Sequence, residues 1–249
     1  MKTGVPRLLV IDISNSFTKF ALADRGRLGR VHRVPTRELT AKSFAAGVAA
    51  LRFDAVVLSS VVPRRTRAIF RALRSPILEI NHLAPLGIGI EYPKPESIGA
   101  DRLANAVACA ALHGTPAIVV DFGTAVTFDV ISKAGDYLGG VIAPGLTAMT
   151  EYLHSRTALL PRIELSEPKH AVGKSTHEAM LAGAVFGYRG LITEIVRQIN
   201  AEAFPKSRPK IVATGGDAEL IAKNTPLFSA VDPLLTLQGL RIVGERAFG

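Results

Sequence analysis

The amino-acid sequence has one cysteine, no tryptophan and few aromatic side chains. Because Cys109 stands alone in 249 residues, no intrachain disulfide can form, and a reducing, cytoplasmic setting is expected. No stretch reaches 18 uninterrupted apolar residues, and the N-terminus lacks the apolar region of a signal peptide. We therefore expect neither a membrane span nor secretion.

Acidic residues are also scarce. The 30 Lys and Arg residues exceed the 21 Asp and Glu residues, which gives a net charge of +9, and Arg-rich segments occur at 25–37 and 64–74. Clustered cations attract phosphates, but the sequence contains none of the common base-reading motifs and only 6% aromatic residues. A nucleic-acid partner is therefore not expected. A solvated basic surface, or attraction of a small anionic substrate, is the better interpretation.

What is present is apolar patterning, since 48% of the residues are hydrophobic. Short β-branched runs alternate with longer segments of helical spacing, which predicts an α/β fold. Expected strands cover 7–13, 17–23, 26–34, 55–61, 76–80, 117–123, 126–131, 210–216 and 228–231, and strand and turn residues are expected over 135–145. Expected helices cover 37–51, 63–73, 100–114, 145–153, 174–200, 217–223 and 235–247.

One phrase occurs twice. LLVIDISNSFTKFAL (8–22) and AIVVDFGTAVTFDVI (117–131) both read strand, Asp, small residues, strand, and Asp12 and Asp121 lie 109 positions apart. Asp and Gly are ordinary turn residues, so one copy means little. Two copies predict two duplicated domains, 1–114 and 115–249. Each turn of small residues exposes backbone N–H groups to an anion, so the pair would hold a polyphosphate between the domains.

Two other glycine-containing segments bear on nucleotide binding. ATGG (213–216) follows a buried strand and offers bare backbone to a flat base or ribose. GKST (173–176) has the tail of a P-loop but lacks the required glycine and the preceding strand. No GxGxxG follows a strand either, so neither a P-loop nor a Rossmann protein is indicated.

Seven motifs then occur in one order along nearly the whole chain. They are DISNS with Lys19 (12–19), IGADRLANA (98–106), VVDFGTAVTFD (119–129), YLGGVIAPGL (137–146), GKST, ATGG and DPLLTLQGL (232–240). In this order they resemble the type III pantothenate kinases, members of the superfamily of acetate kinase, sugar kinases, Hsp70 and actin.

The resemblance implies two ribonuclease-H-like domains with mixed sheets and a nucleotide site in the cleft between them. It implies a homodimeric enzyme that phosphorylates pantothenate to 4'-phosphopantothenate with ATP, the first step of coenzyme A biosynthesis. Mg²⁺ and a monovalent cation, K⁺ or NH₄⁺, would be required.

The resemblance also implies roles for single residues. Asp101 would be the catalytic base, although an acid in a first helical turn is also a plain capping residue. The pantothenate contacts would be Tyr92, Gly99, Ala100, Asp101, Arg102 and, from the partner subunit, Thr176, which is otherwise a helix cap. The ATP contacts would be Asp12, Ile13, Ser14, Asn15, Ser16, Phe17, Thr18, Lys19 and Thr124. Asp121 would bind the monovalent cation.

Other candidates are assigned to structure. Asp129 is expected to be structural and Cys109 to lie in the core. Lys19 could equally be a strand-edge charge, and the histidines show no metal-ligand spacing.

The sequence departs from the family pattern at Ser14, where the resemblance places a glycine. If that position needs a positive φ, serine would cost roughly 1–2 kcal/mol. Alternatively, its hydroxyl adds a hydrogen-bond donor. Ser14 and the basic charge leave open a second hypothesis, a non-catalytic nucleotide-binding regulator or accessory factor on the same fold. The intact Asp101–Arg102 pair argues against that hypothesis.

Overall fold

The computed structural model describes residues 6–249, and the chain forms two compact units. Unit 1 combines the residues up to Leu112 with Leu234–Gly249, and unit 2 is His113–Pro233. The sequence predicted a single division at 114/115. The structure differs because the C-terminal helix packs its apolar side on the core of unit 1.

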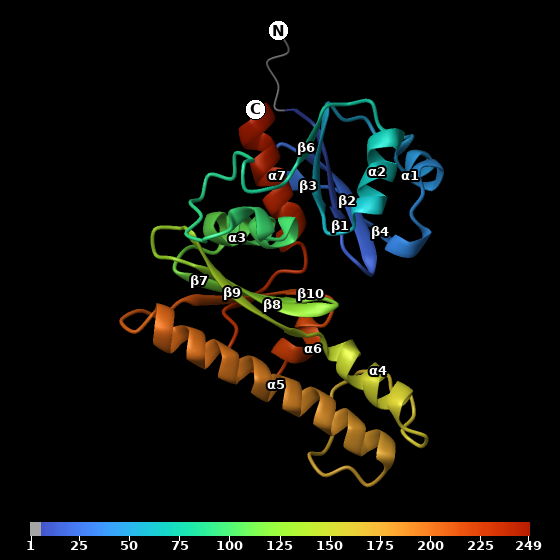
Figure 1. The fold of residues 1–249 in the computed structure, drawn as a ribbon, viewed down its shortest axis with the longest axis vertical. Coiled ribbons are helices and arrows are strands. Elements are labelled where there is room, and N and C mark those ends of the chain that lie inside the picture. The colour runs from blue at the N-terminus through green and yellow to red at the C-terminus, as the bar shows by residue number, and fades with distance from the viewer. Residues whose placement is uncertain (1–5) are drawn as a thin grey trace. The chain divides into compact units, whose positions relative to one another are not determined.

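In the described residues of unit 1, four α-helices pack around six strands (Figure 1). The strands are β1 (Leu8–Ile13), β2 (Phe17–Asp24), β3 (Arg27–Leu28), β4 (His32–Pro35), β5 (Ala55–Ser60) and β6 (Ile77–Glu79). The helices are α1 (Ala41–Val48), α2 (Pro63–Ala72), α3 (Ala100–Leu112) and α7 (Leu235–Phe248), with short 3₁₀ turns at Thr36–Glu38 and Pro95–Ser97.

The central strands of unit 1 are apolar on both faces because helices cover both. Leu9, Ile11 and Ile13 of β1 join a buried cluster with residues of α1 and α2. Leu8 and Val10 point the other way, into a cluster with α3 and α7. Figure 1 shows α1 and α2 together on one side of this sheet and α7 on the other. A side chain's position along β1 therefore decides which helix pair it meets.

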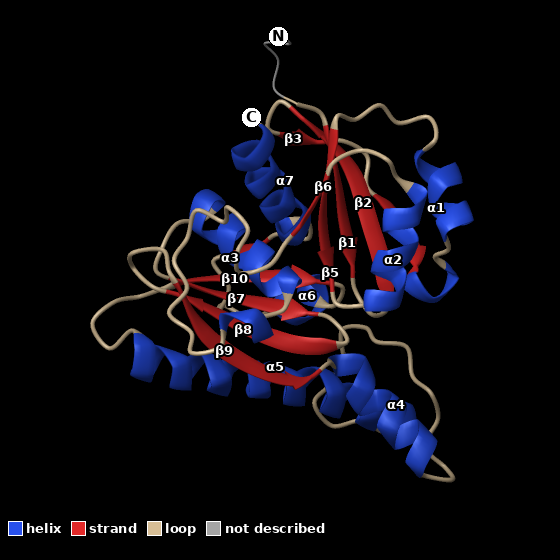
Figure 2. Ribbon diagram, turned by 45° about the horizontal axis from the view of Figure 1, so that its top comes forward, coloured by secondary structure: helices blue, strands red, loops and turns tan. Residues whose placement is uncertain are grey.

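Unit 2 also combines a mixed sheet with helices. Its strands are β7 (Ala117–Phe122), β8 (Ala125–Ile131), β9 (Tyr137–Pro144), β10 (Lys210–Gly215) and β11 (Ala230–Val231). Its helices are α4 (Leu146–Arg156), α5 (Thr176–Ala203) and α6 (Ala218–Ala222). Figure 2 shows α5 running along one face of this sheet.

Helix α5 is long and apolar enough, by length and composition alone, to cross a membrane. Packing accounts for part of that composition, because Val185, Tyr188 and Ile192 are buried in the same cluster as Phe122 and Phe128 of the sheet. These residues of α5 thus belong to the core of unit 2.

The two sheets share one topology, which confirms the duplicated α/β fold. In unit 1, β1 pairs antiparallel with β2 and parallel with β5, and β5 pairs parallel with β6. In unit 2, β7 pairs antiparallel with β8 and parallel with β10, and β10 pairs parallel with β11. The repeated phrase is the antiparallel hairpin at the centre of each sheet.

Two predicted elements of unit 1 are wrong in extent. The strand expected over 26–34 is two strands, because residues 29–31 interrupt the ladder along β2 after the Gly29 N–H has donated to the Leu22 carbonyl, and glycine weakens strand interiors. The helix expected over 37–51 begins only at Ala41. Thr40 adopts an extended conformation and forms a capping box with Ser43, which starts a new helix there.

Candidate active site

The first hairpin has a turn that is held from outside by a buried threonine. The Ser14 N–H donates to the Phe17 carbonyl across the turn at 3.2 Å. The Thr36 hydroxyl donates to the Ser14 carbonyl at 2.7 Å, and the Thr36 N–H donates to the Ser16 carbonyl at 3.0 Å. Sequence reasoning did not single out Thr36. Its only signal was a hydroxyl residue after Pro35, so the turn's rigidity could not be predicted.

Ser14 does not adopt the left-handed conformation. Among the non-glycine residues of the described part of the chain, only Arg25 and Asn224 have a positive φ. The cost of 1–2 kcal/mol considered for a left-handed serine therefore does not arise. Instead, the Ser14 hydroxyl donates a 2.9 Å hydrogen bond to Oδ2 of Asp12.

Asp12 is a buried carboxylate near the end of β1, with 5% of its surface exposed. It lies opposite Lys19 in the antiparallel ladder and beside Ser59 in the parallel ladder. Residues that pair across a sheet point to the same face. Asp12 follows Leu8 and Val10 at intervals of two, so it faces the side of the sheet on which α3 packs.

The first turn of α3 carries the predicted base, Asp101. Helix α3 begins at Ala100, and its first bond runs from the Leu103 N–H to the Gly99 carbonyl at 3.2 Å. The Asp101 carboxylate accepts the Arg102 N–H at 2.9 Å. Burial raises the pKa of Asp101 above its usual value, while that N–H and the Arg102 charge act in the opposite direction. Unit 1 thus presents a partly desolvated carboxylate on the helix whose residues Ala100 and Leu103 pack on the sheet face towards which Asp12 points.

The segment before α3 contributes the other predicted pantothenate contacts. A Cβ at Gly99 would lie 2.6 Å from Oδ1 of Asp101, so the absence of a side chain there leaves that carboxylate approachable. Tyr92 lies in the preceding loop with 37% of its surface exposed. Both positions belong to unit 1, as do Asp101 and Arg102.

The second hairpin is packed against bare backbone. Asp121 and Phe122 end β7, and the two-residue turn Gly123–Thr124 is one residue shorter than the first turn. Gly215, at the end of β10, has a φ of +95°. A Cβ there would lie 2.6 Å from Oδ1 of Asp121 and 2.5 Å from the Phe122 carbonyl oxygen. The ATGG segment therefore lies directly against this hairpin because its glycine has no side chain.

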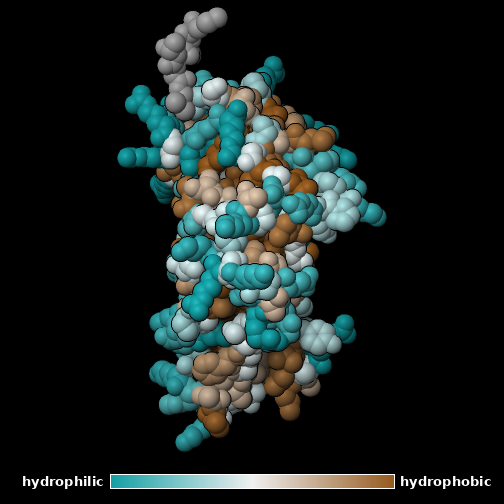
Figure 3. All heavy atoms as spheres, turned by 90° about the vertical axis from the view of Figure 1, so that its left-hand side faces the viewer, coloured by the Kyte–Doolittle hydropathy of each residue, from teal (hydrophilic) through white to brown (hydrophobic). Residues whose placement is uncertain are grey.

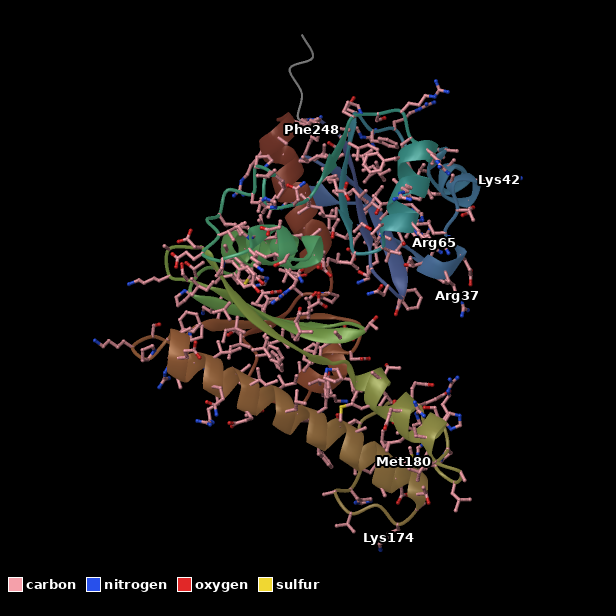
Figure 4. All side chains as sticks on the ribbon, viewed as in Figure 1. Arg37, Lys42, Arg65, Lys174, Met180 and Phe248 are labelled. Carbon is pink, nitrogen blue, oxygen red and sulfur yellow. The ribbon has the colours of Figure 1, made fainter. Side chains whose placement is uncertain are left out.

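The GKST segment forms the N-terminus of α5, which Figure 4 shows with Lys174 just before the helix. The sequence interpretation of Thr176 as the cap is wrong. Ser175 is the N-cap and accepts the Glu178 N–H at 3.2 Å, while the Lys174 N–H donates to the Glu178 carboxylate at 2.7 Å. Because Ser175 performs the capping, the hydroxyl of Thr176 is exposed.

The expected core position of Cys109 is confirmed. Asp129 is fully buried and accepts a hydrogen bond from the Tyr137 hydroxyl at 3.1 Å, and Cys109 is buried in α3. Among the residues from 6 onwards, no group of three or more His, Cys, Asp or Glu side chains gathers as a metal cluster would.

Residues 8–198 match the model of the type III pantothenate kinase family. The chain belongs to this family. A type III pantothenate kinase from Akkermansia muciniphila is 50% identical over 235 residues, which cover 94% of this chain and 96% of that protein. Membership in the family makes the chain a kinase, an enzyme of the phosphotransferase class.

Solved structures agree on the fold. A Campylobacter jejuni protein described as a Baf family transcriptional activator matches with a TM-score of 0.61 at 20% identity, covering 96% of this chain and 98% of that one. A Sinorhizobium meliloti protein described as a 2-dehydro-3-deoxygalactonokinase matches with a TM-score of 0.60 at 12% identity, covering 97% and 99%. At such identities the likeness concerns the fold, which is the sugar-kinase and actin type.

Proposed function

We propose that this protein transfers the γ-phosphoryl group of ATP to the primary hydroxyl of pantothenate, giving 4'-phosphopantothenate and ADP. This is the first step of coenzyme A biosynthesis. The single observation that carries the site assignment is Asp101, a partly desolvated carboxylate in the first turn of α3, the helix that packs on the sheet face towards which Asp12 points. The single buried cysteine fits a cytoplasmic enzyme.

Asp101 would accept the proton of the attacking hydroxyl. Phosphoryl transfer needs little covalent help from the protein but does need an aligned nucleophile and a base within reach. The raised pKa of Asp101 brings it nearer to the operating pH, which strengthens it as a base.

Pantothenate would be held by the residues around Asp101. Arg102 offers a planar fork for the pantothenate carboxylate. Tyr92 and the backbone of Gly99 and Ala100 would contact the rest of the molecule. Arg102 would thus fix the carboxylate end of pantothenate, and the remaining contacts would orient the hydroxyl at its other end towards Asp101.

The first hairpin would contact ATP through its turn, residues 13–18, and through Lys19. Asp12 would hold Mg²⁺, and the fit is good because Mg²⁺ is usually bound through one or two carboxylates together with substrate phosphates. Asp12 is a buried carboxylate that accepts a hydrogen bond from Ser14. It pairs with Lys19 on one neighbouring strand and with Ser59 on the other. When bound there, Mg²⁺ would neutralise charge on the phosphates.

The second hairpin would supply a monovalent-cation ligand and a phosphate contact. The Asp121 carboxylate lies against the bare Gly215 backbone, so a large, weakly hydrated cation such as K⁺ or NH₄⁺ has oxygen ligands without a blocking side chain. The Thr124 hydroxyl would donate to a phosphate oxygen. The cation would supply positive charge near the transferred group.

The test is ADP release with ATP, Mg²⁺ and K⁺, measured with and without pantothenate. Wild-type enzyme should turn over only with pantothenate, and Asp101→Asn should lose the activity while still binding ATP. Asp129→Asn is the matched control, because it changes a buried aspartate that we assign to structure. Pantothenate-independent ADP release, or full activity in Asp101→Asn, would contradict the assignment.

We also propose that the enzyme is a homodimer formed through α4 and α5. Large apolar side chains are exposed on these helices and next to them: Ile142, Met149, Tyr152, Leu153, Leu159, Val172 and Phe186. Figure 3 shows hydrophobic surface, in brown, in the part of unit 2 where Figure 1 shows α4 and the start of α5. Exposed apolar area of this kind marks interaction surfaces.

Thr176 lies at the start of α5, next to this apolar surface, and would reach pantothenate in the partner subunit. Phe186→Glu should convert the dimer to a monomer in sedimentation velocity and lower pantothenate turnover. The control is Phe70→Glu, which changes an exposed phenylalanine of unit 1. A monomeric wild-type enzyme with full activity would contradict the proposal.

A further inference from the structure

We infer that two serines, Ser14 and Ser59, orient the Asp12 carboxylate and the hydration shell of the divalent cation that it holds. The inference rests on the proposed function, because it assigns positioning residues to the magnesium site of that function. Neither serine needs to touch the reacting atoms.

Ser14 acts on Asp12 through a hydrogen bond that a glycine cannot make. The Ser14 hydroxyl donates to Oδ2 of Asp12 at 2.9 Å. Because Asp12 is buried, this bond to a carboxylate is shielded from competing water and belongs to the stronger, charge-assisted class. The turn that carries Ser14 is itself fixed by the Thr36 hydroxyl, so the donor is held in place before any ion binds.

Ser59 approaches Asp12 from the neighbouring strand. It lies beside Asp12 in the parallel β1–β5 ladder, and its spacing from Val57 puts it on the same face of the sheet. Its side chain is fully buried, and its hydroxyl has no hydrogen-bond partner among residues 6–249. A buried hydroxyl without a partner is costly, so its presence beside a carboxylate points to a ligand or an ordered water.

The hydroxyls of Ser14 and Ser59 have different roles around the Asp12 carboxylate. Ser14 occupies one side of Oδ2 and so fixes the side-chain rotamer of Asp12. Ser59 remains available to accept a hydrogen bond from a water bound to the cation, and Mg²⁺ keeps several of its waters in protein sites. The departure from glycine at position 14 thus strengthens the metal site of this chain.

A second effect of the Ser14 hydroxyl on cation binding is physically reasonable. If the Ser14 hydroxyl merely competed with the cation for Oδ2, its removal would tighten cation binding. The two readings predict opposite signs for the same substitution, which makes the experiment decisive.

The experiment measures binding of Mn²⁺, as a probe for the divalent site, to the full-length enzyme with ADP present, by electron paramagnetic resonance. Ser14→Ala and Ser59→Ala are each expected to weaken Mn²⁺ binding, Ser14→Ala by about tenfold, the loss of one charge-assisted hydrogen bond. Ser14→Thr, which keeps the hydroxyl, should restore it. Tighter or unchanged binding in Ser14→Ala would overturn the inference.

Ser60→Ala is the matched control. Ser60 is the next residue on β5 and points to the other face, where its hydroxyl accepts hydrogen bonds from Val62 and Thr66. This variant should lose some stability but keep its Mn²⁺ affinity. Equal weakening in Ser60→Ala and Ser59→Ala would show a general effect of strand disruption and would also overturn the inference.

Asp12→Asn separates failure of the inference from failure of the proposed function. If this variant binds Mn²⁺ as the wild type does, the magnesium assignment in the proposed function is wrong, and the inference falls with it. If Asp12→Asn loses Mn²⁺ while Ser14→Ala and Ser59→Ala retain it, the assignment stands and the two serines have no role. Because Mn²⁺ binding is measured without turnover, the result does not depend on which alcohol the enzyme phosphorylates.

Discussion

Replacing Gly215 by alanine tests whether the second hairpin depends on bare backbone. Two costs add at this position. The φ of +95° is strained for any residue with a Cβ, which costs roughly 1–2 kcal/mol. The new Cβ would also lie 2.5 Å from the carbonyl oxygen and 2.6 Å from the amide nitrogen of Phe122, and backbone cannot move aside as a flexible side chain can.

The expected loss is therefore large. Overpacking in a well-packed region costs about 1–3 kcal/mol, so the two terms together predict a loss of about 2–5 kcal/mol in the free energy of unfolding. Urea unfolding followed by circular dichroism is the suitable assay, since the chain has no tryptophan to report by fluorescence. The Cβ would also crowd Oδ1 of Asp121, so the K⁺ concentration for half-maximal activity should rise.

Gly216→Ala is the control, because the nearest atom to a Cβ there, the Phe122 carbonyl oxygen, is 3.9 Å away, an ordinary contact. This variant should unfold close to the wild-type midpoint. If the Gly215→Ala and Gly216→Ala variants were equally stable, the close approach of the Gly215 backbone to Phe122 would not be what makes glycine necessary there. That result would refute the argument.

Three further predictions concern charge and packing. Burial raises the pKa of Asp101, so its ionised form destabilises the fold at pH values above the ordinary pKa of an aspartate. Asp101→Asn should therefore raise the thermal midpoint at pH 7. For the wild type, kcat/KM should fall as the pH drops through the raised pKa of Asp101. Arg189→Ala breaks a bidentate pair with Glu167, 2.9 and 2.7 Å, and should cost about 2–3 kcal/mol in urea unfolding at pH 7. Arg189 lowers the pKa of Glu167, so the pair stabilises above the ordinary glutamate pKa, and the difference between variant and wild type should shrink as the pH falls through the lowered value. Gly239→Ala should reduce stability by about 1–3 kcal/mol, because its Cβ would overlap the Ala104 carbonyl in the adjacent helix; a wild-type midpoint would contradict that close contact.

Much of the fold could be predicted because the apolar pattern and the packing agree. Residues of β1 and β5 are buried on both faces, and their short β-branched runs signalled this directly. The repeated hairpin phrase correctly predicted the duplication. The C-terminal helix was misassigned because the residues that decide its unit, Leu237 and Val243, carry no mark of which core they enter.

The candidate site could be predicted only in part. Asp12, Asp101 and Asp121 stand at strand or helix ends in recognisable motifs, so their positions followed from the sequence. Thr36 and Ser59 come from segments distant in the sequence and meet the first hairpin only through strand pairing. The conformation of Ser14 depends on its hydrogen bonds, which residue type alone does not specify.

The return of α7 to unit 1 has a consequence for biosynthesis. Leu237, Leu240 and Val243 fill the core cluster that also contains Leu8 and Val10, yet they follow the whole of unit 2 in the chain. All of unit 2 therefore leaves the ribosome before α7, which completes the core of unit 1. Domains usually fold as units in their order of synthesis. Here the order is reversed: unit 2 can fold before unit 1 is complete, and the face of the first sheet on which α3 packs lacks the apolar side chains of α7 until that last helix emerges.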